Sequence, residues 1–307
     1  MSRTPQSLIA ALSQTIVGQR EIVESLVVAL VADGHVLLEG PPGLAKTLAC
    51  RSLAAALDGT FKRVQFTPDL LPADITGTRI FDQRTAQFDT VLGPVFANIV
   101  LADEINRAPA KVQSALLEAM QERQVTIGPQ THALPQPFMV LATMNPIDAD
   151  GTYALPHAQL DRFLFKLQVG FPDAGEELRI LDRFAVSDTQ PLHGIATLQD
   201  VLDWRKAAHA VHLDEKVKRY IVDLVAATRE PHGYVQFGAS PRASLALAFT
   251  ARARAFVNGR DVVLPDDVRA LAGSVLTHRI AYTHRIAVDR VAPETFVAAA
   301  IERVPAP

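Results

Sequence analysis

The segment at residues 40–47 constrains the fold of this chain more than any other part of its sequence. It reads Gly-Pro-Pro-Gly-Leu-Ala-Lys-Thr, follows a strand-like run at 35–39 and opens a helical pattern at 46–57. A glycine-rich turn between a strand and a helix is the setting of a phosphate-binding loop, because backbone N–H groups converge there on an anion. Ala45 replaces the second glycine of the strict motif, and a near-helical backbone at this position would accommodate its methyl group.

The residue types of this loop suit a nucleoside triphosphate. Lys46 would bridge the β- and γ-phosphates, and the hydroxyl of Thr47 would ligate Mg²⁺. The residues expected to contact the nucleotide here are Gly40, Pro41, Pro42, Gly43, Leu44, Ala45, Lys46, Thr47 and Leu48. Taken alone, the motif could also be an ordinary Gly/Pro turn before a helix.

Strand patterns alternate with helix patterns through the first half of the chain. The strand patterns lie at 35–39, 62–66, 99–102, 138–143 and 165–169, and helical patterns such as 46–57 and 110–122 lie between them. This alternation predicts an α/β fold, a parallel sheet flanked by helices, with ligands at the carboxyl ends of its strands.

The strand patterns stop at about residue 171, and five helical patterns follow. They lie at 198–208, 216–228, 241–257, 265–275 and 293–301. We therefore expect a nucleotide-binding domain at 1–170 and a helical domain at 171–307.

Two β-hairpins are expected within the first domain. One is an insert at about 67–95, where 78–81 and 87–91 alternate around a polar turn; the other lies at about 124–138. Long connections of this kind usually have a function, so the hairpins suggest a working surface.

An apolar strand pattern ends in two adjacent acids, Asp103 and Glu104. Neighbouring side chains on a strand point in opposite directions, so we expect the two carboxylates to have different roles. In a nucleotide site Asp103 would hold Mg²⁺ through water, and Glu104 would act as the general base toward the attacking water.

Three more polar residues are candidates for the site. Asn145 follows the strand pattern at 138–143 and could bind the γ-phosphate or the lytic water. Arg162 follows an aspartate, and Arg242 lies at the expected start of a helix. Arginine suits charge that develops on a transferring phosphoryl group, although most arginines are solvated or paired with a nearby acid.

Composition excludes several other classes. The 307-residue chain is 49% hydrophobic and 21% charged, and its formal net charge of −3 offers no general attraction to nucleic acid. Cys50 is the single cysteine, which rules out an intrachain disulfide and fits a reducing, cytoplasmic setting. The longest apolar run, at 26–32, is far shorter than the roughly 20 residues that cross a bilayer, so we expect no direct membrane insertion.

Four runs of sequence carry a resemblance to a known family. They are FTPDLLPADITG at 66–77, GPVFAN at 93–98, ADEINRA at 102–108 and ALLEAM at 115–120. Over nearly its whole length the chain resembles the MoxR family of AAA+ ATPases. The resemblance implies an AAA+ core with a helix-2 insert and a pre-sensor-1 hairpin, a C-terminal all-α lid domain, and hydrolysis of ATP with Mg²⁺.

The resemblance also implies roles for single residues. Asn145 resembles sensor 1, and Arg162 resembles the arginine finger offered to the nucleotide of the next subunit. Arg242 resembles sensor 2, in cis or in trans. Val17 and Gly18 lie in a run, at 16–19, that resembles the loop cradling adenine.

Members of this family are typically hexameric and act with partners that carry von Willebrand factor A domains, in metal insertion or in the maturation of protein complexes. The resemblance therefore implies a homo-oligomer that remodels a protein client. Two alternatives remain open, a nucleotide-gated assembly scaffold and a nucleic-acid motor. Basic residues are scarce in both hairpin segments, which argues against the motor, and the presence of both Glu104 and Arg162 argues mildly against the scaffold.

Overall fold

The computed structural model describes residues 3–41, 43–44, 46–145, 153–186, 192–230 and 232–307, with the backbone alone at 183–186. The chain divides into two compact units. The first comprises Met1–Val27, His35–Leu155 and Leu167–Leu202, and the second comprises Val28–Gly34, Pro156–Lys166 and Asp203–Pro307.

A five-stranded sheet with the order β2-β5-β8-β1-β9 organises the first unit. Leu101 of β5 aligns with Leu141 of β8, and Leu37 of β1 aligns with Ala142, in parallel pairs. The inner strands are apolar and buried, as a sheet covered on both faces requires. The predicted α/β class with a parallel sheet is confirmed. The strands are β1 (Val36–Glu39), β2 (Phe61–Gln65), β5 (Ile99–Asp103), β8 (Met139–Met144) and β9 (Phe165–Gln168).

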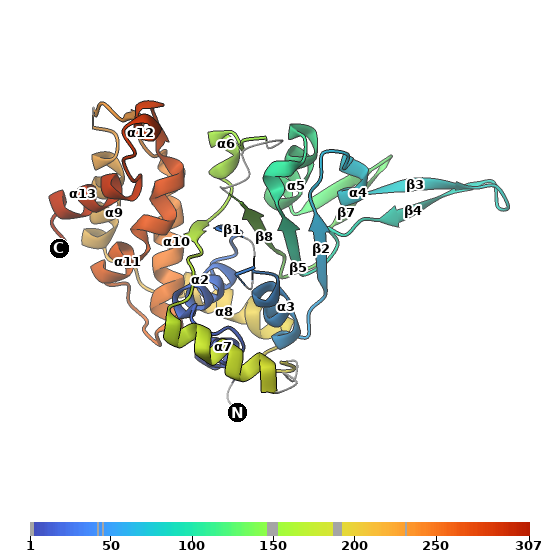
Figure 1. Cartoon of the computed structure of the whole chain (residues 1–307), viewed down its shortest axis with the longest axis horizontal. Helices are drawn as coiled ribbons and strands as arrows, with labels where there is room; N and C mark the ends of the chain where they lie inside the picture. Colours follow the sequence, from blue (N-terminus) through green and yellow to red (C-terminus); the bar gives the residue numbers. More distant parts are fainter. Residues whose placement is uncertain (1–2, 42, 45, 146–152, 187–191, 231) are drawn as a thin grey trace. The chain divides into compact units, whose positions relative to one another are not determined.

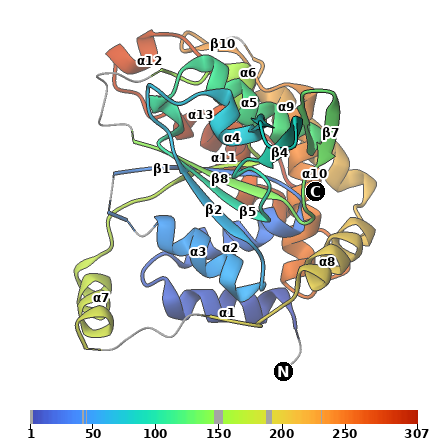
Figure 2. The ribbon, with the colours of Figure 1, turned by 90° about the vertical axis from the view of Figure 1, so that its right-hand side faces the viewer.

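Helices cover both faces of this sheet (Figures 1 and 2). On one face lie α1 (Pro5–Thr15) and α3 (Lys46–Ala56), and on the other lie α4 (Pro72–Thr76) and α5 (Ala110–Glu122). α1 begins at an N-cap, Thr4, whose side chain accepts a hydrogen bond from the backbone N–H of Ser7. The first unit also contains most of α2 (Arg20–Val31), the short η1 (Ile105–Arg107) and α7 (Ala174–Val186).

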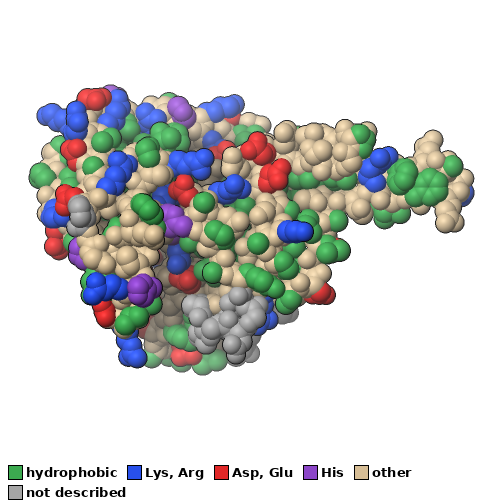
Figure 3. Space-filling view, turned by 90° about the horizontal axis from the view of Figure 1, so that it is seen from above, with side chains coloured by type: hydrophobic (Ala, Val, Ile, Leu, Met, Phe, Trp, Pro, Cys, Tyr) green, Lys and Arg blue, Asp and Glu red, His purple; other side chains and the backbone are tan. Residues whose placement is uncertain are grey.

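Both predicted hairpins are present in the first unit. β3 (Gly77–Asp82) pairs with β4 (Gln87–Leu92), and β6 (Gln124–Ile127) pairs with β7 (Gln130–Ala133), both antiparallel. The first hairpin projects from the sheet, and hydrophobic side chains gather toward its end (Figure 3). The rings of Phe81 and Phe88 lie 5.1 Å apart there, and both side chains are about half exposed. Exposed aromatic rings on a two-stranded hairpin are typical of a contact surface.

The second unit consists mainly of helices, as predicted. A short antiparallel pair of β10 (Val235–Phe237) and β11 (Ala281–Tyr282) was not predicted, because such short runs show no alternating pattern. Along the described parts of the chain, no helix combines the length and the hydropathy that crossing a membrane demands. The helices are α6 (His157–Leu160), α8 (Leu198–Ala210), which starts in the first unit, α9 (Glu215–Ala227), α10 (Pro241–Val257), α11 (Pro265–Leu276), η2 (Thr277–Arg279), α12 (Arg285–Val288) and α13 (Glu294–Arg303).

A buried acid, Asp267, joins α10 to α11 within the second unit. Its carboxylate accepts hydrogen bonds from Arg254 at 2.7 Å, from Arg260 at 2.6 and 2.7 Å, and from the backbone N–H of Leu264 at 2.9 Å. Burial alone would raise the pKa of Asp267, but the hydrogen bonds from Arg260, Leu264 and Arg254 outweigh it and hold the pKa below its ordinary 3.8. The group is therefore charged at neutral pH and fixes the start of α11.

Replacing Asp267 with Asn should lower the free energy of unfolding by about 3 kcal/mol at neutral pH, because two arginines lose a buried counter-charge. A lowered pKa contributes stability that is present above the ordinary value of 3.8 and is lost as the pH falls through the folded-state value. The difference in the free energy of unfolding between variant and wild type should therefore become smaller as the pH is lowered. Urea unfolding at neutral and acidic pH measures both effects.

The exposed neighbour Asp266 provides the control for this prediction. Asp266→Asn should change stability by no more than about 0.5 kcal/mol. Two results would contradict the role of Asp267. One is an equal loss of stability in the two variants, and the other is a loss in Asp267→Asn that does not depend on pH.

Candidate active site

Side chains from several segments of the first unit line a cavity of about 280 Å³ at the carboxyl ends of the inner strands. The strand register explains this convergence, because Glu39 of β1 aligns with Met144 of β8, and Gln65 of β2 aligns with Asp103 of β5. The cavity brings together Lys46, Thr47, Asp103, Glu104 and Asn145, which are separate motifs in the sequence. The remaining lining residues are Gly43, Leu44, Arg63, Gln65 and Thr143.

The loop between β1 and α3 presents Lys46 to this cavity. Gly43 has φ of +85°, a left-handed conformation that favours glycine. The ammonium of Lys46 donates to the carbonyl of Gly40 at 2.6 Å. Burial lowers the pKa of Lys46, and the charges of Asp103 and Glu104 partly offset that shift.

The other expected loop residues are only partly placed. Gly40, Pro41 and Leu48 lie close in the sequence to residues that line the cavity, but they do not line it themselves. Pro42 and Ala45, also expected to contact the nucleotide, lie outside the described residues.

Asp103, the last residue of β5, is held from two sides. Its Oδ1 accepts a hydrogen bond from the Thr143 hydroxyl at 2.6 Å, and its Oδ2 accepts from Arg63 at 2.6 and 3.1 Å. Since each oxygen has a fixed donor, the carboxylate cannot rotate freely, and it faces the cavity in a defined orientation.

Glu104 has a left-handed backbone with φ of +55°, which is uncommon for a residue other than glycine. Its N–H donates to the Thr143 hydroxyl at 2.8 Å. Its Oε2 accepts from Gln65 at 2.9 Å and lies 3.3 Å from Arg107 Nε. Strained residues persist where surrounding contacts hold them, often at active sites, and these three contacts hold Glu104.

The two acids do not point to opposite sides, as a continuous strand would require. Both line the same cavity, because β5 ends at Asp103 and the left-handed backbone of Glu104 breaks the alternation. They differ instead in their partners: Asp103 contacts Arg63, whereas Glu104 contacts Gln65 and Arg107.

Three residues of the cavity escaped the sequence analysis: Arg63, Gln65 and Thr143. Arg63 and Gln65 lie two apart on β2 and so share one face, where each reaches one acid. Thr143 touches both acids through one hydroxyl and is 1% exposed. A threonine that interrupts an apolar strand was a usable signal, whereas Arg63 and Gln65 required knowledge that β2 pairs with β5.

Val17 and Gly18, expected in the adenine loop, line an open hollow of about 590 Å³ in the same unit. Gly18 has φ of +76°, and a Cβ there would lie 2.7 Å from the Glu176 carboxyl group. The side chain of Gln19 donates to the carbonyl of Leu44 at 3.3 Å. The expected adenine loop therefore contacts the expected phosphate loop directly.

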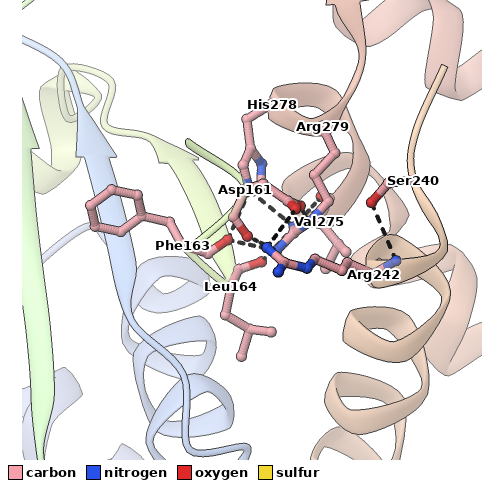
Figure 4. Close-up of polar contacts among 8 residues, drawn as sticks. All are labelled: Asp161, Phe163, Leu164, Ser240, Arg242, Val275, His278 and Arg279. Atoms are coloured by element: carbon pink, nitrogen blue, oxygen red, sulfur yellow. Dashed lines mark hydrogen bonds and ion pairs between the residues drawn. The ribbon is translucent and has the colours of Figure 1, made fainter. Parts of the chain in front are cut away.

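Arg162 and Arg242 belong to the second unit, where Asp161 contacts Arg242 and precedes Arg162 in the sequence. Arg242 lies in the first turn of α10, its side chain is 66% exposed, and its Nη1 lies 3.7 Å from Oδ2 of Asp161. Asp161 directly precedes Arg162. Figure 4 shows Asp161 between the side chains of Arg242 and Arg279.

The residues of the cavity fit Mg²⁺. The Thr47 hydroxyl and the Asp103 carboxylate line it together with Lys46, and Mg²⁺ prefers such hard oxygen ligands. Mg²⁺ in nucleotide sites takes most of its ligands from phosphates and water, so one hydroxyl and one carboxylate suffice from the protein.

Comparisons with known proteins identify two family models, related proteins and a solved structure that this chain resembles. A family model described as "ATPase family associated with various cellular activities (AAA)" matches residues 35–165, and an AAA lid domain model matches residues 227–298. The chain is 48% identical to the protein "Chaperone MoxR1" of Mycobacterium tuberculosis, over 99% of this chain and 82% of that protein. It is 47% identical to the uncharacterised protein YeaC of Bacillus subtilis, over 88% of this chain and 84% of that protein.

A solved structure has the same fold. It is the crystal structure of a protein from Cytophaga hutchinsonii that is described as a candidate ATPase, with 42% sequence identity and a TM-score of 0.92. The match covers 98% of this chain and 94% of that one.

Thr143 gives the sharpest test of how this cavity is organised. Thr143→Val keeps the shape of the side chain but leaves the partly buried N–H of Glu104 without its partner, which should lower the free energy of unfolding by about 1–3 kcal/mol. Because the Asp103 carboxylate and the Glu104 backbone each lose an anchor, ATP turnover should fall about 10- to 100-fold. Thr143→Ser keeps the hydroxyl and should retain most of the turnover. Steady-state ATPase assays decide: wild-type turnover in Thr143→Val would show that the hydroxyl does not organise the acids.

Proposed function

The chain belongs to the MoxR family of AAA+ ATPases, and from this premise we propose that it uses ATP hydrolysis to remodel a protein client. The observation that carries the proposal is the cavity in which Lys46, Thr47, Asp103, Glu104 and Asn145 meet. A cation, a hydroxyl, two carboxylates and an amide around one space can serve both phosphate binding and water activation.

Each of these residues has a proposed role in hydrolysis. Lys46 and the loop amides bind the phosphates, and Thr47 and Asp103 hold Mg²⁺, which neutralises phosphate charge when bound. Glu104 is the general base toward the attacking water. Asn145, which is 9% exposed after the end of β8, binds the γ-phosphate or that water as sensor 1.

Arg162 completes the site of a neighbouring subunit in this proposal. An arginine finger supplied in trans contributes roughly 10³–10⁵ in rate, so assembly would control activity. Arg242, in the first turn of α10, is the proposed sensor 2. The family resemblance supports a homo-oligomer, with a hexamer as the proposed form.

The first hairpin supports a protein client rather than a nucleic acid. Ile80, Phe81 and Phe88 are each about half exposed on it, and the guanidinium of Arg79 lies 4.7 Å from the centre of the Phe88 ring. Apolar surface suits contact with protein, whereas a nucleic-acid groove needs free basic side chains.

The biological setting is proposed mainly from the family resemblance, and the cytoplasmic location from the single cysteine. It includes a partner with a von Willebrand factor A domain, a role in metal insertion or complex maturation, and a cytoplasmic location. The single cysteine, Cys50, is buried and agrees with a reducing compartment.

Glu104→Gln tests the remodelling proposal. Loss of the general base should slow hydrolysis at least about 10²-fold and leave ATP bound. If hydrolysis drives release, this variant should retain its client in MgATP while the wild type releases it. Affinity capture followed by mass spectrometry compares the two proteins, with Glu122→Gln, an exposed acid on α5, as the control that should behave like wild type.

Two results would point elsewhere. Equal retention of the same client by wild type and by Glu104→Gln would favour a nucleotide-gated scaffold. ATPase activity that single-stranded or duplex DNA stimulates in a salt-sensitive manner would favour a nucleic-acid motor.

A further inference from the structure

A buried arginine in the second unit, Arg279, directs its contacts at one short segment. It ends η2, and its side chain is only 4% exposed. Its Nε donates to Oδ1 of Asp161 at 2.9 Å. Its terminal nitrogens donate to the backbone carbonyls of Phe163 at 2.7 Å, Leu164 at 3.1 Å and Asp161 at 3.3 Å (Figure 4). These three carbonyls lie on both sides of Arg162.

The guanidinium of Arg279 is fully satisfied. Besides the contacts to 161–164 it donates to the carbonyl of Val275, so all five of its N–H groups have acceptors. Burial lowers the pKa of Arg279 to about 10, and the charge of Asp161 limits that shift, so the group stays charged at neutral pH. A buried charge with every donor engaged can hold only one geometry.

His278 supports the same segment. Its Nε2 lies 2.9 Å from the Phe163 carbonyl, and the ring is 4% exposed. Burial, reinforced by the charge of Arg279, lowers the pKa of His278 well below its ordinary value, so the ring is neutral. The Phe163 side chain is itself fully buried and points away from these contacts (Figure 4).

Arg162 differs from its neighbours. Among the residues that the structure describes, its guanidinium makes no hydrogen bond or ion pair, while Asp161 and Phe163 on either side are fixed. The backbone is held on both sides of Arg162, but its side chain is not engaged. Such a side chain is able to act on a group outside its own unit.

We propose that Arg279 is the positioning residue of Arg162: it holds the backbone on both sides, with Asp161 as its acidic partner, so that Arg162 is presented to the neighbouring subunit. The proposal rests on the proposed action of Arg162 in trans. Lysine carries the same charge but offers three donors from a single point, so it cannot replace the five-donor fork of arginine. Arg279→Lys should therefore leave ATP binding intact and lower turnover about 10²-fold, because a displacement of about 1 Å is enough for that loss.

Complementation between subunits separates this role from a loss of folding. Glu104→Gln subunits are inactive at their own site but keep a normal Arg162 segment. When mixed with Arg279→Lys subunits in equal amounts, they should supply the missing arginine to roughly half of the Arg279→Lys sites, because ring neighbours assort at random. Mixing should thus raise turnover far above that of either variant alone. Donor subunits that carry both Glu104→Gln and Arg162→Ala should fail to do so.

Arg162→Ala subunits mixed with Glu104→Gln subunits provide the reference. If that mixture regains turnover and the Arg279→Lys mixture does not, the positioning role is wrong while the finger in trans stands. If Arg162→Ala alone turns over at the wild-type rate, or is not rescued, the proposed finger itself fails and the positioning role with it. Rescue of Arg279→Lys by the doubly substituted donor would also overturn the proposal.

Two further variants control for stability. Arg260→Lys alters a comparable arginine contact, that with Asp267, in the same unit, and should keep turnover normal even if it lowers the unfolding temperature. Asp161→Asn removes the acid while leaving the backbone carbonyls, and it provides the same complementation test should Arg279→Lys not fold. Normal turnover in a folded Arg279→Lys protein would contradict the proposal directly.

Discussion

Parallel pairing of the inner strands is the constraint on which this structure depends. Strands that run in one direction end at one edge of the sheet. The register of β1, β5 and β8 places Glu39 beside Met144, and Asp103 about one residue away from them along the strands. Apolar burial sets that register, because a slip by one residue would turn the side chains of an inner strand to the opposite face. The chemistry of the cavity thus depends on packing in the sheet behind it.

Polar contacts then refine what packing brings together. In the first unit Thr143 joins Asp103 to the strained backbone of Glu104. In the second unit Arg279 brackets the backbone around Arg162. In both places a buried polar side chain fixes the backbone at or beside a charged residue, which is how a preorganised site avoids the cost of reorienting its groups during reaction.

Local patterns in the sequence predicted much of the fold. The strand and helix patterns and both hairpins correspond to observed elements, because hydrophobic period and turn residues report on local structure. The candidate residues from 46 to 145 were recognisable as motifs, and the strand register explains why they meet. Residues defined by tertiary contacts were not predictable. Arg63 matters only because β2 lies beside β5, and Arg279 only because η2 meets a segment more than a hundred residues earlier.

The central claim is that the cavity at the strand ends binds the triphosphate of ATP through Lys46. Titration calorimetry of ATP with and without Mg²⁺, on the wild type and on Lys46→Ala, tests it most directly. The account predicts Mg²⁺-dependent affinity that falls about 10²-fold or more in Lys46→Ala, since a partly buried charge contact to phosphate is lost. Lys111→Ala, at an exposed lysine on α5, should bind like the wild type. Unchanged affinity in Lys46→Ala would contradict the account.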